Sequence, residues 1–158
     1  MFSDARQHSL LDTLPSRSFV TLMELYEDNY ILVRRLVPGL QDLDGAYVSR
    51  VSGTADLHLR VLEQTPYTTS LSLTHVFRRP DAAAAQPDLQ LRIYHDARAG
   101  EVLPETDVTH FDLWGGRQPE RKSLEWRWEL NRFLNRWLRY CLNEGHGFSP
   151  AYAPAETG

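Results

Sequence analysis

The densest group of chemically versatile side chains in the sequence is Tyr94-His95-Asp96, at the end of a run that alternates apolar and polar residues. Neighbouring side chains of a β-strand point to opposite faces, so His95 and Asp96 cannot pair as in a catalytic triad without a bend. Tyr94 and Asp96 are expected instead to share a face with Arg92, and with His58 and Arg60 of an earlier run. Such a polar face could bind an anion or a carboxylate group; the alternative is a solvated sheet face with cross-strand charge pairs.

Six histidines and one cysteine offer the side chains of a metal site, but their spacing does not match one. There is no His-x-x-x-His pair on a predicted helix and no Cys-x-x-Cys pair. His75 lies on the apolar side of its alternating run and Cys141 on the apolar stripe of a helix, so we interpret both as core residues. The sequence also has no glycine-rich phosphate loop and no Gly-x-Ser-x-Gly motif. We therefore expect no metal, no cofactor and no familiar catalytic motif.

A basic surface is predicted on the last helix. Residues 120–140 include six basic and three acidic residues, in a protein whose net charge is −4. Trp126 and Trp128 lie near the start of this segment, and arginine beside aromatic residues suits the binding of an acidic protein or RNA. The alternative is a solvated face, on which Glu129 pairs with Arg132 and arginine stems cover apolar surface.

The composition is typical of one globular domain: 158 residues, 42% hydrophobic and 24% charged. No apolar run approaches the ~20 residues that cross a bilayer, and the start of the chain lacks the pattern of a secretion signal. The single cysteine cannot form an intramolecular disulfide. These features predict a cytoplasmic protein without membrane contact, and the negative net charge disfavours binding of nucleic acid.

Two long helices are predicted near the two ends of the chain. The first extends from Ser18, a suitable N-cap, to Val37, just before Pro38-Gly39. Its expected apolar stripe comprises Phe19, Leu22, Met23, Tyr26, Tyr30, Val33 and Val37. The second extends from about Ser123 to Glu144 and is followed by Gly145. Its expected apolar face comprises Leu130, Phe133, Leu134, Trp137, Leu138, Cys141 and Leu142.

Between the helices, alternating runs have the period of half-buried β-strands. They lie at residues 47–51, 55–63, 69–77 and 89–95, with a weaker run at 106–113 and a short connection at 97–100. The simplest way to bury these faces is a two-layer α+β domain, with an antiparallel sheet of about five strands and both helices packed on one face. A strongly curled sheet that grips the C-terminal helix around a cavity is the alternative.

The domain is predicted to occupy residues 18–147. Residues 1–17 are expected to form an N-terminal arm, because they mix polar residues with one short apolar patch. Residues 148–158, rich in proline and alanine and without a period, are expected to form a C-terminal tail. No internal repeat and no linker between domains is evident in the sequence.

Several segments resemble a known family. They are residues 26–30 with 36–38, 67–69, 92–97 with 101–102, and 131–142 with Gly145. The most specific stretches are Tyr-His-Asp-Ala and Trp-Leu-Arg-Tyr-Cys-Leu. On these residues the chain is similar to the bacterial domain-of-unknown-function family 1249. The resemblance implies a small cytosolic bacterial protein and supplies no activity, cofactor or catalytic residue.

One feature of the chain departs from the family pattern. The family often has an acidic-acidic-basic triplet before the asparagine of its last helix. This chain has Glu125-Trp126-Arg127 at that place, so the middle acid is missing. A site that requires two acids there does not fit this protein.

The matching segments also hold polar residues at positions where packing alone does not require them: Glu27, Asn29, Arg92, Asp96, Glu101 and Asn131. These residues could meet at an edge where the helices cover the sheet. Two interpretations are open. One is a buried polar network that fixes how the helices dock, since buried polar groups need partners. The other is a recognition site.

The leading functional hypothesis is a non-enzymatic protein-interaction or regulatory module, monomeric or homodimeric, that binds a protein partner. The alternative is a small-molecule-binding protein or an enzyme, with a pocket between the sheet and the C-terminal helix. RNA binding through the arginine-rich helix is a second alternative. The candidate binding residues for these hypotheses are Glu27, Asn29, Tyr67, Arg92, Tyr94, His95, Asp96, Asn131, Arg132, Arg136 and Arg139.

Overall fold

The computed structural model describes residues 18–76, 85–106, 113–114 and 116–149. This part of the chain begins with helix α2 (Phe19–Leu36) and the short 3-10 helix η1 (Leu40–Asp42), and it ends with helix α3 (Leu124–Asn143). The strands between them are β1 (Ala46–Ser49), β2 (Asp56–Gln64), β3 (Thr68–Val76), β4 (Ala85–Tyr94) and β5 (Ala99–Val102). The predicted order of one helix, a series of strands and a second helix is confirmed.

Helix α2 begins with a capping box. The Ser18 hydroxyl accepts the backbone N–H of Thr21 at 3.1 Å, and the Thr21 hydroxyl accepts the backbone N–H of Ser18 at the same distance. These two bonds satisfy N–H groups that have no partner inside the helix. The helix ends at Leu36, because Pro38 cannot continue it.

The buried face of α2 is rotated from the predicted stripe. Phe19 is 66% exposed, so its assignment to the apolar stripe was wrong. Because α2 contacts both α3 and the sheet edge, it buries a broader face than one stripe. That face comprises Thr21, Leu22, Leu25, Asn29, Leu32, Val33 and Leu36.

Helix α3 has the predicted boundaries to within one residue. The Ser123 hydroxyl accepts the backbone N–H of Trp126 at 3.2 Å and caps the helix. Glu125 in the first turn suits the positive end of the helix dipole. After the helix, Gly145 adopts a φ of 96°, a left-handed conformation that glycine tolerates and other residues rarely adopt.

The sheet is an antiparallel meander with the strand order β1-β2-β3-β4-β5. Leu59 of β2 lies opposite Leu73 of β3, and Leu71 of β3 lies opposite Leu91 of β4. Directly opposite residues share a face, so these leucines form one continuous apolar surface.

The fifth strand of the described sheet is β5, which precedes the weak run predicted at 106–113. Thr106 and Leu113 belong to no strand, and residues 107–112 lie outside the described part of the chain. The connection predicted at 97–100 is shorter, because Ala99 and Gly100 already pair with β4. Arg98, with a φ of 55°, completes the tight turn that makes this pairing possible.

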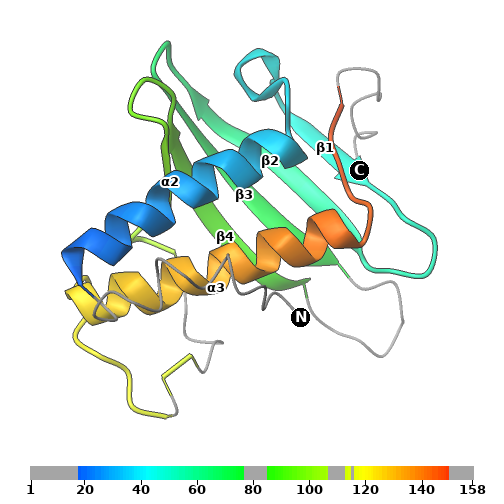
Figure 1. The fold of residues 1–158 in the computed structure, drawn as a ribbon. Helices are drawn as coiled ribbons and strands as arrows, with labels where there is room; N and C mark the ends of the chain where they lie inside the picture. The colour runs from blue at the N-terminus through cyan, green and yellow to red at the C-terminus, as the bar shows by residue number, and fades with distance from the viewer. Residues whose placement is uncertain (1–17, 77–84, 107–112, 115, 150–158) are drawn as a thin grey trace.

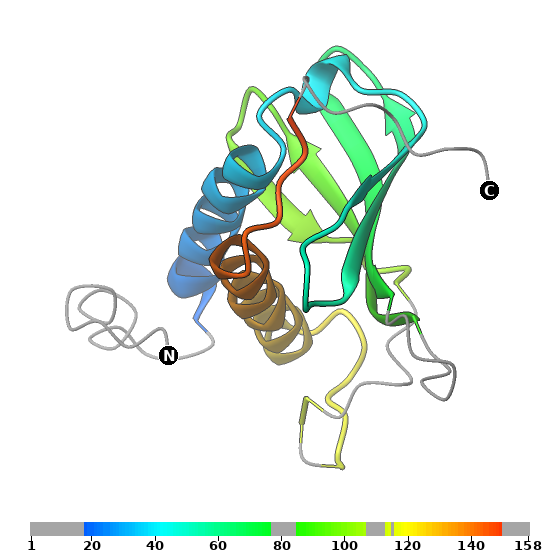
Figure 2. The ribbon, with the colours of Figure 1, turned by 90° about the vertical axis from the view of Figure 1, so that its right-hand side faces the viewer.

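Both helices pack on the same face of the sheet, as Figures 1 and 2 show. They lie side by side and run in the same direction (Figure 1). Buried leucines of β2, β3 and β4 and apolar residues of α3 belong to one core cluster, in which Leu57, Leu130 and Leu138 are 0% exposed. The two-layer α+β architecture predicted from the sequence is therefore confirmed.

The core extends to Phe148, which the sequence assigned to the C-terminal tail. Its side chain is 4% exposed, and its backbone N–H donates to the Leu36 carbonyl at 2.8 Å. The predicted arm at 1–17 and the end of the tail at 150–158 lie outside the described residues. Over the described ranges, no helix is long and apolar enough to cross a membrane.

Candidate functional site

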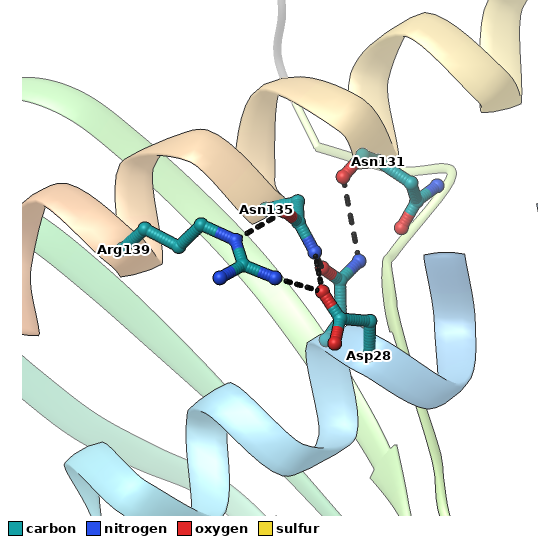
Figure 3. A network of polar contacts seen from close by, with 5 residues as sticks. Asp28, Asn131, Asn135 and Arg139 are labelled. Carbon is teal, nitrogen blue, oxygen red and sulfur yellow. Dashed lines mark hydrogen bonds and ion pairs between the residues drawn. The ribbon is translucent and has the colours of Figure 1, made fainter. Parts of the chain in front are cut away.

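A buried polar network joins the two helices (Figure 3). Asn29 of α2 is 0% exposed, and its amide nitrogen donates to the Asn131 carbonyl of α3 at 3.4 Å. Asn135, one turn further along α3, donates to the Asn29 side-chain oxygen at 3.0 Å and to an Asp28 oxygen at 2.8 Å. Each amide therefore has a partner on the other helix, and the network favours one register of the helix pair.

Arg139 closes this network at its exposed end. Its guanidinium donates to the Asp28 carboxylate at 2.5 Å and to the Asn135 side-chain oxygen at 3.0 Å. The Arg139 side chain is 23% exposed and the Asp28 side chain 39% exposed. The sequence placed Arg139 in a partner-binding face with Arg132 and Arg136, but the structure engages Arg139 inside the protein.

Asn131 links the helix pair to the edge of the sheet. Its side-chain oxygen accepts the backbone N–H of Val102 in β5 at 2.9 Å, and its amide nitrogen donates to the Arg127 carbonyl at 2.9 Å. Asn29 and Asn131, two of the candidate residues, are thus brought together. Their geometry matches a buried polar network that fixes how the helices dock, which is one of the two interpretations left open by the sequence.

A second polar cluster lies on β4 and β5. The Tyr94 hydroxyl donates to Glu101 at 2.7 Å, and Arg92, directly opposite Glu101, donates to the Ser70 hydroxyl at 3.2 Å. Burial and the hydrogen bond to Glu101 raise the pKa of Tyr94. Burial and the Glu101 charge raise the pKa of Tyr26, on α2, to about 12. Both tyrosines are neutral hydrogen-bond donors at neutral pH.

These residues do not line a pocket between the sheet and α3. Leu91 and Ile93 are fully buried in the core, so Arg92 and Tyr94, which alternate with them, project from the opposite face of β4. His58 and Arg60 occupy the same outer face of β2, because each lies opposite an outward residue of β3. The shared polar face predicted from strand alternation agrees with this register.

The remaining candidates near the end of the sheet are separated from that cluster. His95 points to the core side and contacts the Thr69 hydroxyl at 2.7 Å. Tyr67 is 64% exposed in the turn between β2 and β3, and Asp96 is exposed in the turn after β4. Glu27 is exposed on α2. Among the described contacts, neither Glu27 nor Asp96 forms a hydrogen bond with the polar network between α2 and α3.

His75 and Cys141 are core residues, as predicted from the sequence. The Trp137 indole N–H donates to His75 Nδ1 at 2.9 Å, and His75 Nε2 lies 3.8 Å from the Cys141 sulfur. Because Nδ1 accepts a hydrogen bond, the neutral imidazole carries its proton on Nε2. Burial lowers the pKa of His75 to about 4 and raises that of Cys141 to about 12, so neither side chain is charged at neutral pH. Within the described residues, no group of histidine, cysteine and acidic side chains could hold a metal ion.

The exposed face of α3 carries Arg132, Arg136 and Tyr140, spaced four residues apart. Arg132 and Arg136 are exposed, and Tyr140 is 50% exposed. The Arg132 guanidinium lies 5.5 Å from the centre of the Trp128 ring. The Tyr140 and His75 rings form a T-shaped pair with their centres 6.0 Å apart. Each of these contacts holds a surface side chain against a buried ring.

The tryptophans themselves are not free to bind a partner. Trp126 is 1% exposed and Trp128 is 6% exposed, and the Trp128 indole donates to the Thr21 hydroxyl at 2.7 Å. The prediction that both rings contribute to a binding surface was wrong. Tryptophan carries a large apolar surface: Trp126 is buried in the main core cluster, and Trp128 packs with Leu22 and Leu25 of α2.

Asp28 and Asn135 belong to the site but were not among the candidates. A signal for Asn135 exists in the sequence: residues 131, 135 and 139 are polar at intervals of four on the predicted helix. Such spacing places three polar side chains on one helix face. Asp28 has no comparable signal, because its partners lie more than 100 residues away in the chain.

The amino-acid sequence matches one family of known proteins. Residues 32–147 match the family described as "Protein of unknown function (DUF1249)". The chain is 32% identical to proteins called "Uncharacterized protein YqiB" from strains of Escherichia coli, over 137 residues. The match covers 85% of this chain and 95% of each relative. No solved structure matches the chain.

Proposed function

The chain belongs to the DUF1249 family of proteins of unknown function, and from that premise we propose that it is a non-enzymatic cytoplasmic module that binds an acidic protein. The binding surface is the exposed stripe of Arg132, Arg136 and Tyr140 on α3. We call these three residues the α3 stripe. Arginine and tyrosine are the residue types that contribute most to protein interfaces.

One observation supports this proposal most directly. The side chains of the α3 stripe are exposed to solvent, yet two of them are held in place by contacts with buried rings. Arg132 stacks on Trp128, and Tyr140 contacts His75, so two of the three lose little conformational freedom when a partner binds. Partial burial and the Arg132 charge lower the pKa of Arg136, with Glu129 acting in the opposite direction. A carboxylate from a partner would relieve the repulsion between the two guanidinium groups.

The overall charge favours a protein partner over RNA. The chain carries a net charge of −4, so any phosphate backbone that approaches α3 is repelled by the rest of the molecule. An acidic segment of a protein can contact the α3 stripe locally without covering the acidic surface.

The test is affinity capture from a bacterial lysate with the purified protein and two double variants. The first variant, Arg132→Glu with Arg136→Glu, reverses the charge of the α3 stripe and leaves Arg139 bound to Asp28. The second, Arg35→Glu with Arg60→Glu, changes the net charge equally at exposed positions on α2 and β2. Circular dichroism first establishes that all three proteins are folded.

We expect one set of captured proteins to be lost from the α3 variant and retained by the control variant. Capture should weaken as salt increases, because surface charges are screened. Retention of the same proteins by both variants would overturn the proposal. Capture that disappears after nuclease treatment would replace a protein partner with RNA.

A further inference from the structure

A stripe of three exposed side chains runs along the outer side of helix α2. Glu27, Ile31 and Arg35 are spaced four residues apart, and this spacing places all three on one face of the helix. Glu27 and Arg35 are exposed, and Ile31 is 47% exposed. The buried face of α2 packs against α3 and the sheet, so the three side chains face away from both (Figure 2). We call these three residues the α2 stripe.

The charges of the α2 stripe are not paired inside the protein. Within the ranges that the structure describes, no hydrogen bond or ion pair joins Glu27 or Arg35 to another residue. A single exposed isoleucine is ordinary on a protein surface. Here, however, Ile31 lies midway between two unpaired charges of opposite sign, four residues from each. This symmetric arrangement calls for a partner that matches all three side chains.

The order acidic, apolar, basic is its own complement when a second helix runs in the opposite direction. If Ile31 of two copies meets on a two-fold axis, Glu27 of each copy lies opposite Arg35 of the other. Each charge lies about one turn, roughly 6 Å, from the axis, so both ion pairs stay within reach at shallow crossing angles. We propose that the α2 stripe is the interface of a homodimer with two-fold symmetry.

A second copy of the chain fits this surface better than a partner of one charge. An acidic segment would pair with Arg35 but would be repelled by Glu27, and a basic segment would meet the opposite conflict. A second copy presents both signs in the reverse order and satisfies both charges. One helix from each copy buries less area than a standard interface of about 1,600 Å², so the dimer dissociates reversibly on dilution.

The experiment is sedimentation velocity of the full chain over a series of concentrations, with two single charge reversals. In a dimer of Glu27→Arg, arginine faces arginine twice, and in a dimer of Arg35→Glu, glutamate faces glutamate twice. We expect each change to weaken dimerisation at least about tenfold. Arg60→Glu, exposed on the outer face of the sheet, alters the net charge as Arg35→Glu does and should leave the dimer intact.

Mixing the two single variants is the sharpest measurement. Each variant repels a copy of itself, but in the mixture arginine at positions 27 and 35 of one chain faces glutamate at positions 35 and 27 of the other. We expect the mixture to form a heterodimer about as tightly as the unaltered protein forms its homodimer. Neither a loss of folding nor a general effect of net charge produces such a rescue.

A protein that stays monomeric at every concentration its solubility allows would overturn the proposal. So would a dimer that both single variants form as tightly as the unaltered protein, or a mixture of the variants that does not associate. The α3 stripe lies on the other helix, so the failure of one proposal leaves the other standing. Arg35→Glu is also part of the capture control, and proteins retained by that control are bound independently of the dimer.

Discussion

The side-chain oxygen of Asn131 accepts the backbone N–H of Val102 at 2.9 Å. Asn131 lies on α3, whereas Val102 ends β5, the edge strand of the sheet. A strand of four residues pairs with only one neighbour and is weakly held by backbone hydrogen bonds alone. The asparagine supplies a further bond from the helix layer and fixes the distance between the two layers at this edge.

Replacing Asn131 with alanine should destabilise the protein. The change leaves the buried Val102 N–H without its acceptor, and a buried unsatisfied group of this kind costs about 1–3 kcal/mol. Urea unfolding measures the difference in the free energy of unfolding. Asn143→Ala, at an exposed position on the last turn of α3, is the matched control and should change stability by less than about 0.5 kcal/mol. Equal effects of the two substitutions would show that the bond to Val102 contributes nothing.

The ion pair between Asp28 and Arg139 should show measurable coupling between the helices. A double-mutant cycle with Asp28→Asn and Arg139→Gln should give an interaction energy of about 1 kcal/mol, because the charged pair is partly buried and bonded to Asn135. A parallel cycle of Asp28→Asn with Arg136→Gln should give a value near zero. Coupling of the same size in both cycles would contradict the assignment of Arg139 to the interior network and Arg136 to the surface.

The buried His75 should make the protein less stable in acid. Burial and the neighbouring His146 lower the pKa of His75 from 6.5 to about 4. The unfolded chain therefore binds a proton at this histidine before the folded protein does, and stability falls as the pH decreases from about 6.5 towards about 4. Between about pH 7 and about pH 5, this one group should reduce the free energy of unfolding by about 2 kcal/mol.

The variant His75→Gln isolates this contribution. The glutamine oxygen can still accept from the Trp137 indole, but the side chain does not titrate. Its loss of stability between the two pH values, measured by urea unfolding, should be smaller than that of the unaltered protein. All other ionisable groups are shared, so equal losses in the two proteins would show that His75 does not resist protonation in the folded state.

The helices and the four strands β1 to β4 could be predicted from the sequence because their signals are local. Ser18 and Ser123 have the residue type of a cap, and alternation over five to nine residues identifies a half-buried strand. β5 could not be predicted, because four residues that include a glycine contain no usable period. The strand exists because a tight turn returns the chain to β4.

The candidate site was predictable only in part, for a similar reason. Asn29 and Asn131 attract attention as amides at positions where packing alone does not require a polar residue, but their partners depend on how the helices align. The alignment also explains the errors at Trp128 and Arg139. A sequence shows that an aromatic or charged residue is present, whereas the partner that buries it, here Thr21 or Asp28, comes from a distant segment.

The close approach of α2 to β5 gives a final prediction, at Gly100. A Cβ atom at this position would lie 2.9 Å from Ile93 Cδ1 and 3.4 Å from the backbone nitrogen of Tyr30. Gly100→Ala should therefore reduce the free energy of unfolding by about 1–3 kcal/mol, since the core is overpacked. Gly147→Ala is the control, because its Cβ would meet only the Leu36 carbonyl oxygen at an ordinary 3.9 Å.

A second substitution separates the two contacts at Gly100. Ile93→Val removes the Cδ1 atom that the new methyl group meets first, at a cost of about 0.5–1.5 kcal/mol by itself. In the Gly100→Ala background the same change should cost less or restore stability, because it relieves the overlap. Additive losses in the double variant would mean that the backbone of α2 at Tyr30, and not the Ile93 side chain, excludes a Cβ atom. That result would make Gly100 the residue that sets how closely α2 can approach the edge of the sheet.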